Sequence, residues 1–159
     1  YYGHQGNNIM IFQGGESIEL IFRVPATTNV LHRLGFHDRQ DIAAVPVDGV
    51  WIEIAGTTLS GKTSNNSTAS TTANTYAITA NTWYKLKISI NQIKTIATFE
   101  LYASPSTTPL WSDTLTTNIP TTAGRAFGLL LVVGKTTAGT ANIFDFDWVR
   151  YIGSQTLNR

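Results

Sequence analysis

The clearest pattern along this chain is an alternation of hydrophobic and polar side chains in short segments. In residues 82–91, for example, Leu86 and Ile88 alternate with Lys85 and Lys87. The same period of two runs through residues 17–24, 49–55 and 95–103, and more weakly through residues 30–37. Successive side chains of a β-strand point to opposite faces of its sheet, so this period is typical of strands with one buried face. No segment shows a helical period over more than about three turns.

Turn-forming residues separate these segments. Gly, Pro, Asn and Thr dominate the connections, as in QGGES, VPATTN, ASPSTTP and NIPTTAG. About ten to twelve short strands joined by such turns predict an all-β fold, an antiparallel two-sheet β-sandwich. The length of 159 residues suits a single domain spanning 1–159. Because the chain starts at Tyr1 and not at a methionine, we expect it to be the C-terminal fragment of a longer protein.

The predicted core lies between the two sheets. Strand parity places eight large side chains there, and they are Phe22, Ile52, Leu86, Ile88, Phe99, Leu101, Phe146 and Trp148.

Residues 127–134, FGLLLVVG, break the alternation because both faces of this strand are apolar. A two-layer sandwich covers one face of a strand, so the second face needs another cover. A neighbouring subunit is one such cover, and a long loop such as 36–49 is the other. The first alternative predicts a homotrimer, because a closed ring buries the same patch of every chain.

Residues 60–76 are almost entirely small and polar. They suit either a flexible linker or a polar hairpin on an exposed sheet edge, and the β-prone threonines favour the hairpin. The overlapping segment GTTLSGKT (56–63) matches the P-loop pattern of nucleotide-binding proteins, but no helical pattern follows Thr63, as that loop requires. We therefore expect an exposed Lys62, no helix in residues 63–72 and no bound nucleotide.

Composition excludes several classes of partner. Charged residues make up 13% of the chain, the net charge is +1, and Lys and Arg form no run, so nucleic-acid binding is not expected. No apolar run approaches the roughly 18 residues of a membrane span. The chain has no cysteine, so a core or an oligomer must stabilise it in place of disulfides.

The last predicted strand, IFDFDWVRYIG (143–153), carries two carboxylates on one face. Parity puts Asp145 and Asp147 opposite the core-facing Phe146 and Trp148. Two parallel side chains of one strand are poorly placed to flank a glycosidic bond, and they offer too few oxygens for Ca²⁺. We interpret both aspartates as surface groups that pair with cations on neighbouring strands or accept hydrogen bonds from loop amides.

The strand pattern and the closing sequences FGLLLVVG and IFDFDWVRY resemble the concanavalin A-like lectin/glucanase superfamily. The resemblance implies a jelly-roll sandwich of the concanavalin or laminin-G type. Glucanases of that superfamily carry E-x-D-x-x-E on one strand, with the two glutamates as nucleophile and acid/base. Aligned on Asp147, this chain has Asp145 at the first position and Arg150 at the acid/base position. Arginine does not release its proton at a usable pH, so we expect no catalytic residue and no glycoside hydrolysis.

The ending WVRYIGSQTLNR, the Thr- and Asn-rich composition and the missing cysteines resemble the C-terminal ends of bacteriophage tail-fibre proteins. This resemblance implies a trimeric head domain of the virion, made in the host bacterial cytoplasm. Such a head binds a bacterial surface polysaccharide or an outer-membrane protein. A polysaccharide depolymerase and a purely structural trimerisation cap remain as alternatives.

Binding of sugar requires exposed aromatic rings beside polar groups that form hydrogen bonds. By strand parity Trp51 points away from the core, and Tyr102 and Trp111 are the next aromatic candidates. His37 and Asp38 are the polar candidates. A subunit contact would bury the same rings. We expect no cofactor and no metal, because the chain has no cysteine and His32 and His37 lie on opposite faces of one strand.

Overall fold

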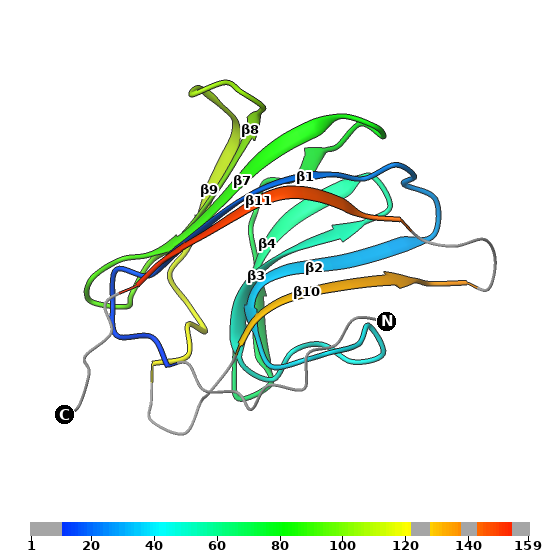
Figure 1. Ribbon diagram of the computed structural model, residues 1–159. Coiled ribbons are helices and arrows are strands. Elements are labelled where there is room, and N and C mark those ends of the chain that lie inside the picture. Colours follow the sequence, from blue (N-terminus) through cyan, green and yellow to red (C-terminus); the bar gives the residue numbers. More distant parts are fainter. Residues whose placement is uncertain (1–10, 122–127, 138–142, 154–159) are drawn as a thin grey trace.

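The computed structural model describes residues 11–121, 128–137 and 143–153, and these residues form strands and connections without a helix (Figure 1). No described segment is therefore a helix long and apolar enough to cross a membrane. Eleven strands are described: β1 (Ser17–Arg23), β2 (Val30–His37), β3 (Gly49–Ala55), β4 (Thr58–Asn65), β5 (Thr68–Thr71), β6 (Tyr76–Ala77), β7 (Trp83–Ile90), β8 (Ala97–Ala103), β9 (Pro109–Leu115), β10 (Gly128–Lys135) and β11 (Asp145–Ile152).

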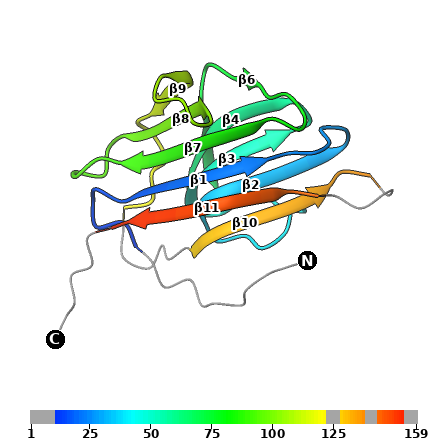
Figure 2. The same cartoon turned by 45° about the horizontal axis from the view of Figure 1, so that its top comes forward.

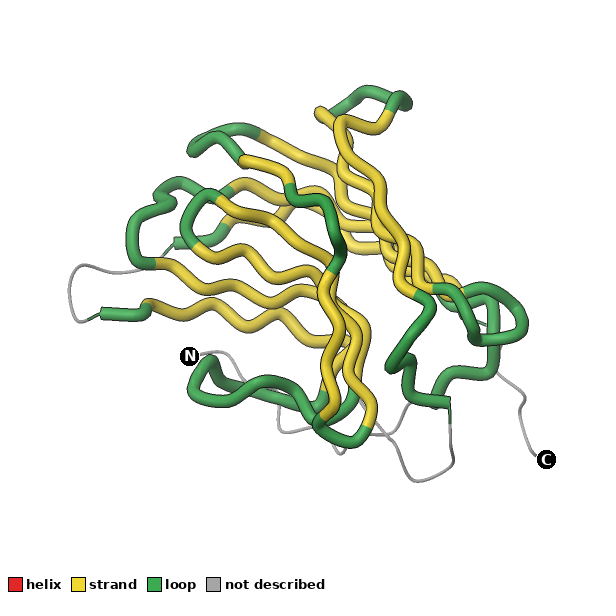
Figure 3. Tube along the Cα trace, turned by 180° about the vertical axis from the view of Figure 1, so that it is seen from behind, coloured by secondary structure: helices red, strands yellow, loops and turns green. Residues whose placement is uncertain are grey.

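The strands form two sheets that face each other as the layers of a sandwich (Figures 1 and 3). One sheet has the order β11-β1-β7-β8-β9, and the other has the order β10-β2-β3-β4-β5, with β6 beside β4. Every described pair is antiparallel. The predicted all-β sandwich is confirmed. Its first and last strands are neighbours, which places distant parts of the sequence side by side.

The core follows from the alternation. In β1 the burial pattern has a period of two, and Ile18, Leu20 and Phe22 face the other sheet. Six of the eight predicted core side chains are fully buried: Phe22, Ile52, Leu86, Ile88, Phe99 and Leu101. Gly61 of β4 makes room for one of them, because a β-carbon at this position would lie 2.6 Å from Cδ2 of Phe99.

The other two predicted core side chains lie on strand β11, and for them the prediction fails. Phe146 is 58% exposed and Trp148 is 41% exposed, so their predicted burial is wrong. For Trp148 the cause is a bulge: Trp148 pairs with the outward Ile21 and Phe146 pairs with Phe22, which leaves Asp147 without a partner on β1. Phe146 faces inward like its partner Phe22, and it is exposed because β11 is the last strand of its sheet. One extra residue inverts the parity of a strand. Beyond the bulge the residues that turn inward are therefore Val149 and Tyr151.

The polar segment forms the predicted hairpin, with β4 and β5 at the edge of the six-stranded sheet. Residues 63–72 contain no helix, as expected. The expected exposure of Lys62 is wrong, because only 22% of its side chain is exposed and its Nζ binds Thr71 and Glu53. The helix that a P-loop requires is absent from this segment, because β4 is joined by a short turn directly to β5.

Strand β10 receives part of its second cover from the segment 38–48, which connects β2 to β3. Val132 is buried on the outer side of β10, and a β-carbon at Gly134 would lie 2.5 Å from Cγ2 of Ile42. At Val132 and Gly134 the second face of the strand is therefore covered by the long loop, which was one of the two covers expected from the sequence. Leu129 and Val133 remain partly exposed. Phe127 lies outside the described residues, and the homotrimer stays a prediction.

Candidate functional site

Each sheet has an outer face, turned away from the other sheet. On the outer face of the six-stranded sheet a polar row crosses four neighbouring strands. Arg33 of β2 donates from Nε to Oε2 of Glu53 on β3 at 3.0 Å. Nζ of Lys62 on β4 lies 3.6 Å from Oε1 of Glu53 and donates to Oγ1 of Thr71 on β5 at 2.9 Å. The polar groups of this row bind one another, since the Glu53 carboxylate contacts both Arg33 and Lys62.

The segment 38–48 covers part of this face. Figure 1 shows it passing below β2 and β10, on the side away from the five-stranded sheet. Nη1 of Arg33 donates to the carbonyl oxygens of Asp41 at 3.1 Å and Ala44 at 2.6 Å, so the segment is tied to β2. Asp38 closes its other end, because Oδ1 accepts a hydrogen bond from the Val47 amide at 3.0 Å.

Two candidates from the sequence lie on this face and are completely buried. Trp51 points away from the core, as parity predicted, and packs edge-on against His37 with 6.2 Å between the ring centroids. Burial, together with the charge of Arg33, lowers the pKa of His37 from 6.5 to about 3. Neither ring is accessible, so neither contacts a ligand in this conformation.

The outer face of the five-stranded sheet is different, because aromatic rings reach the surface there. Arg23 of β1 stands between Asp145 of β11 and Trp83 of β7 in the strand register. Its Nε and Nη2 donate to Oδ2 of Asp145 at 2.9 and 2.7 Å. Its guanidinium carbon lies 5.0 Å from the Trp83 ring centroid, within the range of a cation–π contact. Trp83 is 37% exposed.

A second row crosses the same sheet two residues further along. The register places Trp148, Ile21, Lys85 and Tyr102 side by side on four strands. Nζ of Lys85 lies 4.3 Å from the Tyr102 ring centroid. The hydroxyl of Tyr102 donates to Oε1 of Glu100 at 2.9 Å, and burial and this hydrogen bond raise the tyrosine pKa to about 12.

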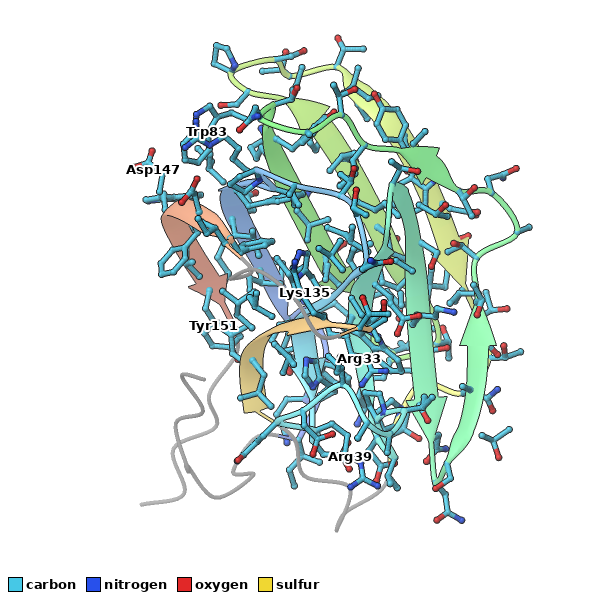
Figure 4. All side chains as sticks on the ribbon, turned by 90° about the vertical axis from the view of Figure 1, so that its right-hand side faces the viewer. Arg33, Arg39, Trp83, Lys135, Asp147 and Tyr151 are labelled. Atoms are coloured by element: carbon cyan, nitrogen blue, oxygen red, sulfur yellow. The ribbon has the colours of Figure 1, made fainter. Side chains whose placement is uncertain are left out.

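We call these two rows the aromatic face; its residues are Arg23, Trp83, Lys85, Tyr102, Asp145 and Trp148. In the view of Figure 4, Trp83 and Asp147 lie at one end of the molecule, far from Arg33. A third row follows, in which Arg150, Glu19, Lys87 and Glu100 alternate in charge. The aromatic face therefore combines flat apolar rings with paired charges held in fixed positions.

The structure separates the five residues proposed from the sequence. Tyr102 belongs to the aromatic face but is mostly covered, and Trp111 lies in the core between the sheets. Trp51, His37 and Asp38 belong to the six-stranded sheet and its covering segment. The exposure expected of Trp51, Tyr102 and Trp111 is therefore wrong.

Sequence reasoning missed Trp83, Trp148 and Arg23. Trp83 shares the polar phase of Lys85 and Lys87, a signal that was readable in the alternation. The bulge concealed Trp148. The pair of Arg23 with Asp145 joins residues 122 positions apart, so only the strand order reveals it.

Metal binding gains no support from the part of the chain that the structure describes. There, no group of three or more His, Asp or Glu side chains is gathered as a metal site would require. Asp145 is paired with Arg23, which confirms the interpretation of this aspartate as a surface group that pairs across strands.

Comparison with solved structures places the fold among concanavalin A-like sandwiches. The protein of unknown function SO2946 from Shewanella oneidensis MR-1 superposes with a TM-score of 0.73 at 21% identity, covering 96% of this chain and 63% of that chain. A xylan β-1,4-xylosidase from Bacillus halodurans C-125 gives a TM-score of 0.62 at 14% identity, covering 86% of this chain and 27% of that chain. An alginate lyase A1-II′ gives 0.53 at 10% identity, covering 94% of this chain and 66% of that chain.

A search among curated protein sequences found no match. The chain spans 63% of the SO2946 structure. One family model, described as the SO2946-like C-terminal domain, matches residues 1–147. The match extends over most of the 159 residues, and the chain belongs to the family of SO2946-like C-terminal domains.

Proposed function

We propose that this domain binds a polysaccharide on its aromatic face and does not cleave it. The observation that carries the proposal is the pair of partly exposed tryptophans near the Arg23–Asp145 ion pair: Trp83 lies in the same row, beside Arg23, and Trp148 lies in the next row. Sugar rings pack their apolar faces on aromatic side chains, and their hydroxyl groups form hydrogen bonds with polar groups beside the ring. The aromatic face offers both kinds of contact on one surface.

The ion pair keeps hydrogen-bonding capacity for a ligand. Both hydrogen bonds from Arg23 end on Oδ2 of Asp145. Among the described residues, Oδ1 of Asp145 and Nη1 of Arg23 have no protein partner. A carboxylate oxygen accepts from one hydroxyl while a guanidinium N–H donates to the next, an arrangement suited to two neighbouring hydroxyl groups of a sugar.

Binding without cleavage fits the chemistry of both outer faces. Asp145 is paired with Arg23, and Arg150 occupies the position of the acid/base in the resembling glucanases. Glu53 bridges two cations, and His37 is buried and neutral. Two of the similar folds belong to proteins named for action on polysaccharides, a xylosidase and an alginate lyase, which supports the ligand class at the level of the fold alone.

We propose further that the polysaccharide belongs to a bacterial surface and that the domain is the receptor-binding tip of a phage tail fibre. The support is compositional: charged residues are only 13% of the chain, cysteine is absent, and small polar side chains form much of the surface. An outer-membrane protein is the alternative receptor. A cap that serves trimerisation alone would show no affinity for bacterial cells.

The test is affinity electrophoresis of the protein through gels that contain capsular polysaccharide, lipopolysaccharide O-chains, xylan or alginate. We expect at least one polymer to retard the protein. In Trp83→Ala we expect the affinity to fall about tenfold, which corresponds to a loss of about 1.4 kcal/mol of binding free energy from the contact with the ring. Ile93→Ala removes an exposed apolar side chain from the β7–β8 connection and serves as the matched control.

A second variant separates ring stacking from hydrogen bonding. Asp145→Asn keeps the shape of the side chain but removes the charge that holds Arg23, so we expect weaker binding with Trp83 intact. A polymer bound equally well by Trp83→Ala, Asp145→Asn and Ile93→Ala would contradict the assignment to the aromatic face. New reducing ends in a bound polymer would contradict binding without cleavage.

A further inference from the structure

Strand β11 is apolar on both faces and exposed on both faces. Four of its eight residues are large hydrophobic side chains with substantial exposure: Phe146 58%, Val149 46%, Ile152 43% and Trp148 41%. A sandwich strand normally buries one face, as β1 and β7 do. The exposed side chains of β11 therefore form an apolar strand surface of the kind that marks protein–protein contacts.

The backbone of β11 has an open edge as well. Among the described residues only β1 pairs with it, and the sheet order places β11 at the end of the five-stranded sheet. Figure 2 shows it along one side of the sandwich, next to β10 of the other sheet. Proteins usually protect such edges. Here β5 is short and β9 begins at Pro109, whereas β11 is eight residues long, contains neither proline nor glycine, and has its bulge at Asp147, near its first end.

We propose that β11 pairs antiparallel with β11 of a second copy of this chain, on a two-fold axis that passes through Val149. The two five-stranded sheets then continue across the axis as one sheet. Each copy supplies the N–H and C=O groups that the other lacks at this edge, so the contact is self-complementary as a two-fold interface requires.

The side chains of β11 select this register. Directly opposite residues of an antiparallel pair lie on the same face of the sheet. With Val149 opposite itself, the outward Trp148 of each copy lies opposite the outward Arg150 of the other, a cation–π arrangement. If Asp147 is left unpaired in this contact too, as it is in the pairing with β1, Phe146 of one copy lies opposite Tyr151 of the other on the inner face. The carboxylate of Asp147 then lies beside the partner's Arg150, with opposite charges in contact.

Neighbouring registers are less favourable. Centring on Arg150 sets two like charges opposite each other, which destabilises a strand pair. Centring on Trp148 sets the outward Arg150 opposite the inward Phe146, because the bulge has inverted the parity between them. Charge and parity thus favour the register centred on Val149 over these two, and the proposed assembly is a dimer in place of the homotrimer that the apolar β10 segment predicted.

Disulfide trapping tests the register. The chain has no cysteine, so Val149→Cys introduces the only thiol. Opposite residues of an antiparallel pair have Cα atoms about 4.5 to 5.5 Å apart, within the range of a disulfide. We expect mild oxidation to convert Val149→Cys to a covalent dimer. Ile93→Cys is the control, because residue 93 is 73% exposed and lies in the turn between β7 and β8.

The mass in solution tests the assembly without a new bond. We expect light scattering to give about 35 kDa, twice the chain mass of 17.4 kDa, and Val149→Lys to give the monomer mass because it sets two like charges on the axis. Ile93→Lys should remain dimeric.

Any of three results would overturn the proposal. They are a monomer mass for the unmodified chain at all concentrations up to about 100 μM, a trimer mass, and equal cross-linking of Val149→Cys and Ile93→Cys. Circular dichroism of each variant shows whether the fold is retained. Loss of dimerisation with intact polysaccharide binding would leave the proposed function standing, so the two proposals fail separately.

Discussion

His32 and His37 are five residues apart on β2, and both rings are buried, on opposite faces of the strand. His32 packs edge-on against Phe144 in the core with 5.2 Å between ring centroids, and the described residues offer its ring nitrogens no hydrogen-bond partner. Burial lowers the pKa of His32 from 6.5 to about 4 and that of His37 to about 3. Both rings are therefore neutral in the folded protein at pH values where the unfolded chain is protonated.

This difference predicts acid sensitivity. Between pH 6.5 and about 4 the unfolded chain binds protons at these histidines and the folded chain does not, so the free energy of unfolding falls as the pH falls. Each histidine contributes a slope of up to about 1.4 kcal/mol per pH unit. Urea unfolding at pH 7, 6 and 5 measures the slope. In His32→Leu we expect it to decrease by one histidine's share, and an unchanged slope would disprove the neutral burial of His32.

At the scale of elements, a side chain of β2 attaches the segment 38–48 to its sheet. Arg33 binds Glu53 on its own sheet and two carbonyl oxygens of the segment, and it is almost completely buried. The segment in turn lies over the face that holds Trp51 and His37. The guanidinium thus connects β2 to its cover, and Ser64 of β4 adds a second attachment by donating to the Val47 carbonyl oxygen at 2.9 Å.

Replacing this residue should release the segment. In Arg33→Met we expect trypsin to cleave after Arg39 several-fold faster than in the unmodified chain, because the segment loses its attachment to β2. The free energy of unfolding should decrease by about 3 kcal/mol, the usual cost of removing one partner of a buried ion pair. Lys87→Met removes a cation of the opposite sheet and is the control. Equal cleavage rates in the two variants would exclude this role of Arg33.

At the scale of the whole molecule, the two sheets are held together by a single core, which Tyr151 of β11 contacts and the outward Trp148 does not. Phe99 is fully buried against Gly61 of the opposite sheet, whereas Trp148 lies on the outer face of an edge strand. Truncation of the two aromatic side chains should therefore have different consequences, although the alternation assigned both to the core.

Phe99→Ala should lower the free energy of unfolding by about 3 to 5 kcal/mol, because it leaves a cavity between the sheets. Trp148→Ala should lower it by about 1 kcal/mol or less, since a partly exposed side chain loses little burial. Urea unfolding at a concentration where the protein is monomeric compares the two. Equal losses would show that Trp148 belongs to the core after all.

The sequence by itself determined the strands and their inward faces. A period of two is a local property of the backbone, so the burial of Ile18, Leu86 and Phe99 could be predicted without knowledge of any partner strand. The same locality made the β4–β5 hairpin readable, because its two strands are joined by a short turn.

The tertiary structure alone decided which faces meet and which strand departs from the period. The bulge at Asp147 arises from the pairing of β11 with β1 and inverts the parity of every residue beyond it, which is why Trp148 was misplaced. The burial of Trp51 depends on a segment that folds back across its sheet. The aromatic face joins Arg23 to Asp145 across 122 positions, because the first and last strands of the described chain are neighbours, and lateral strand order leaves no periodic signal in a sequence.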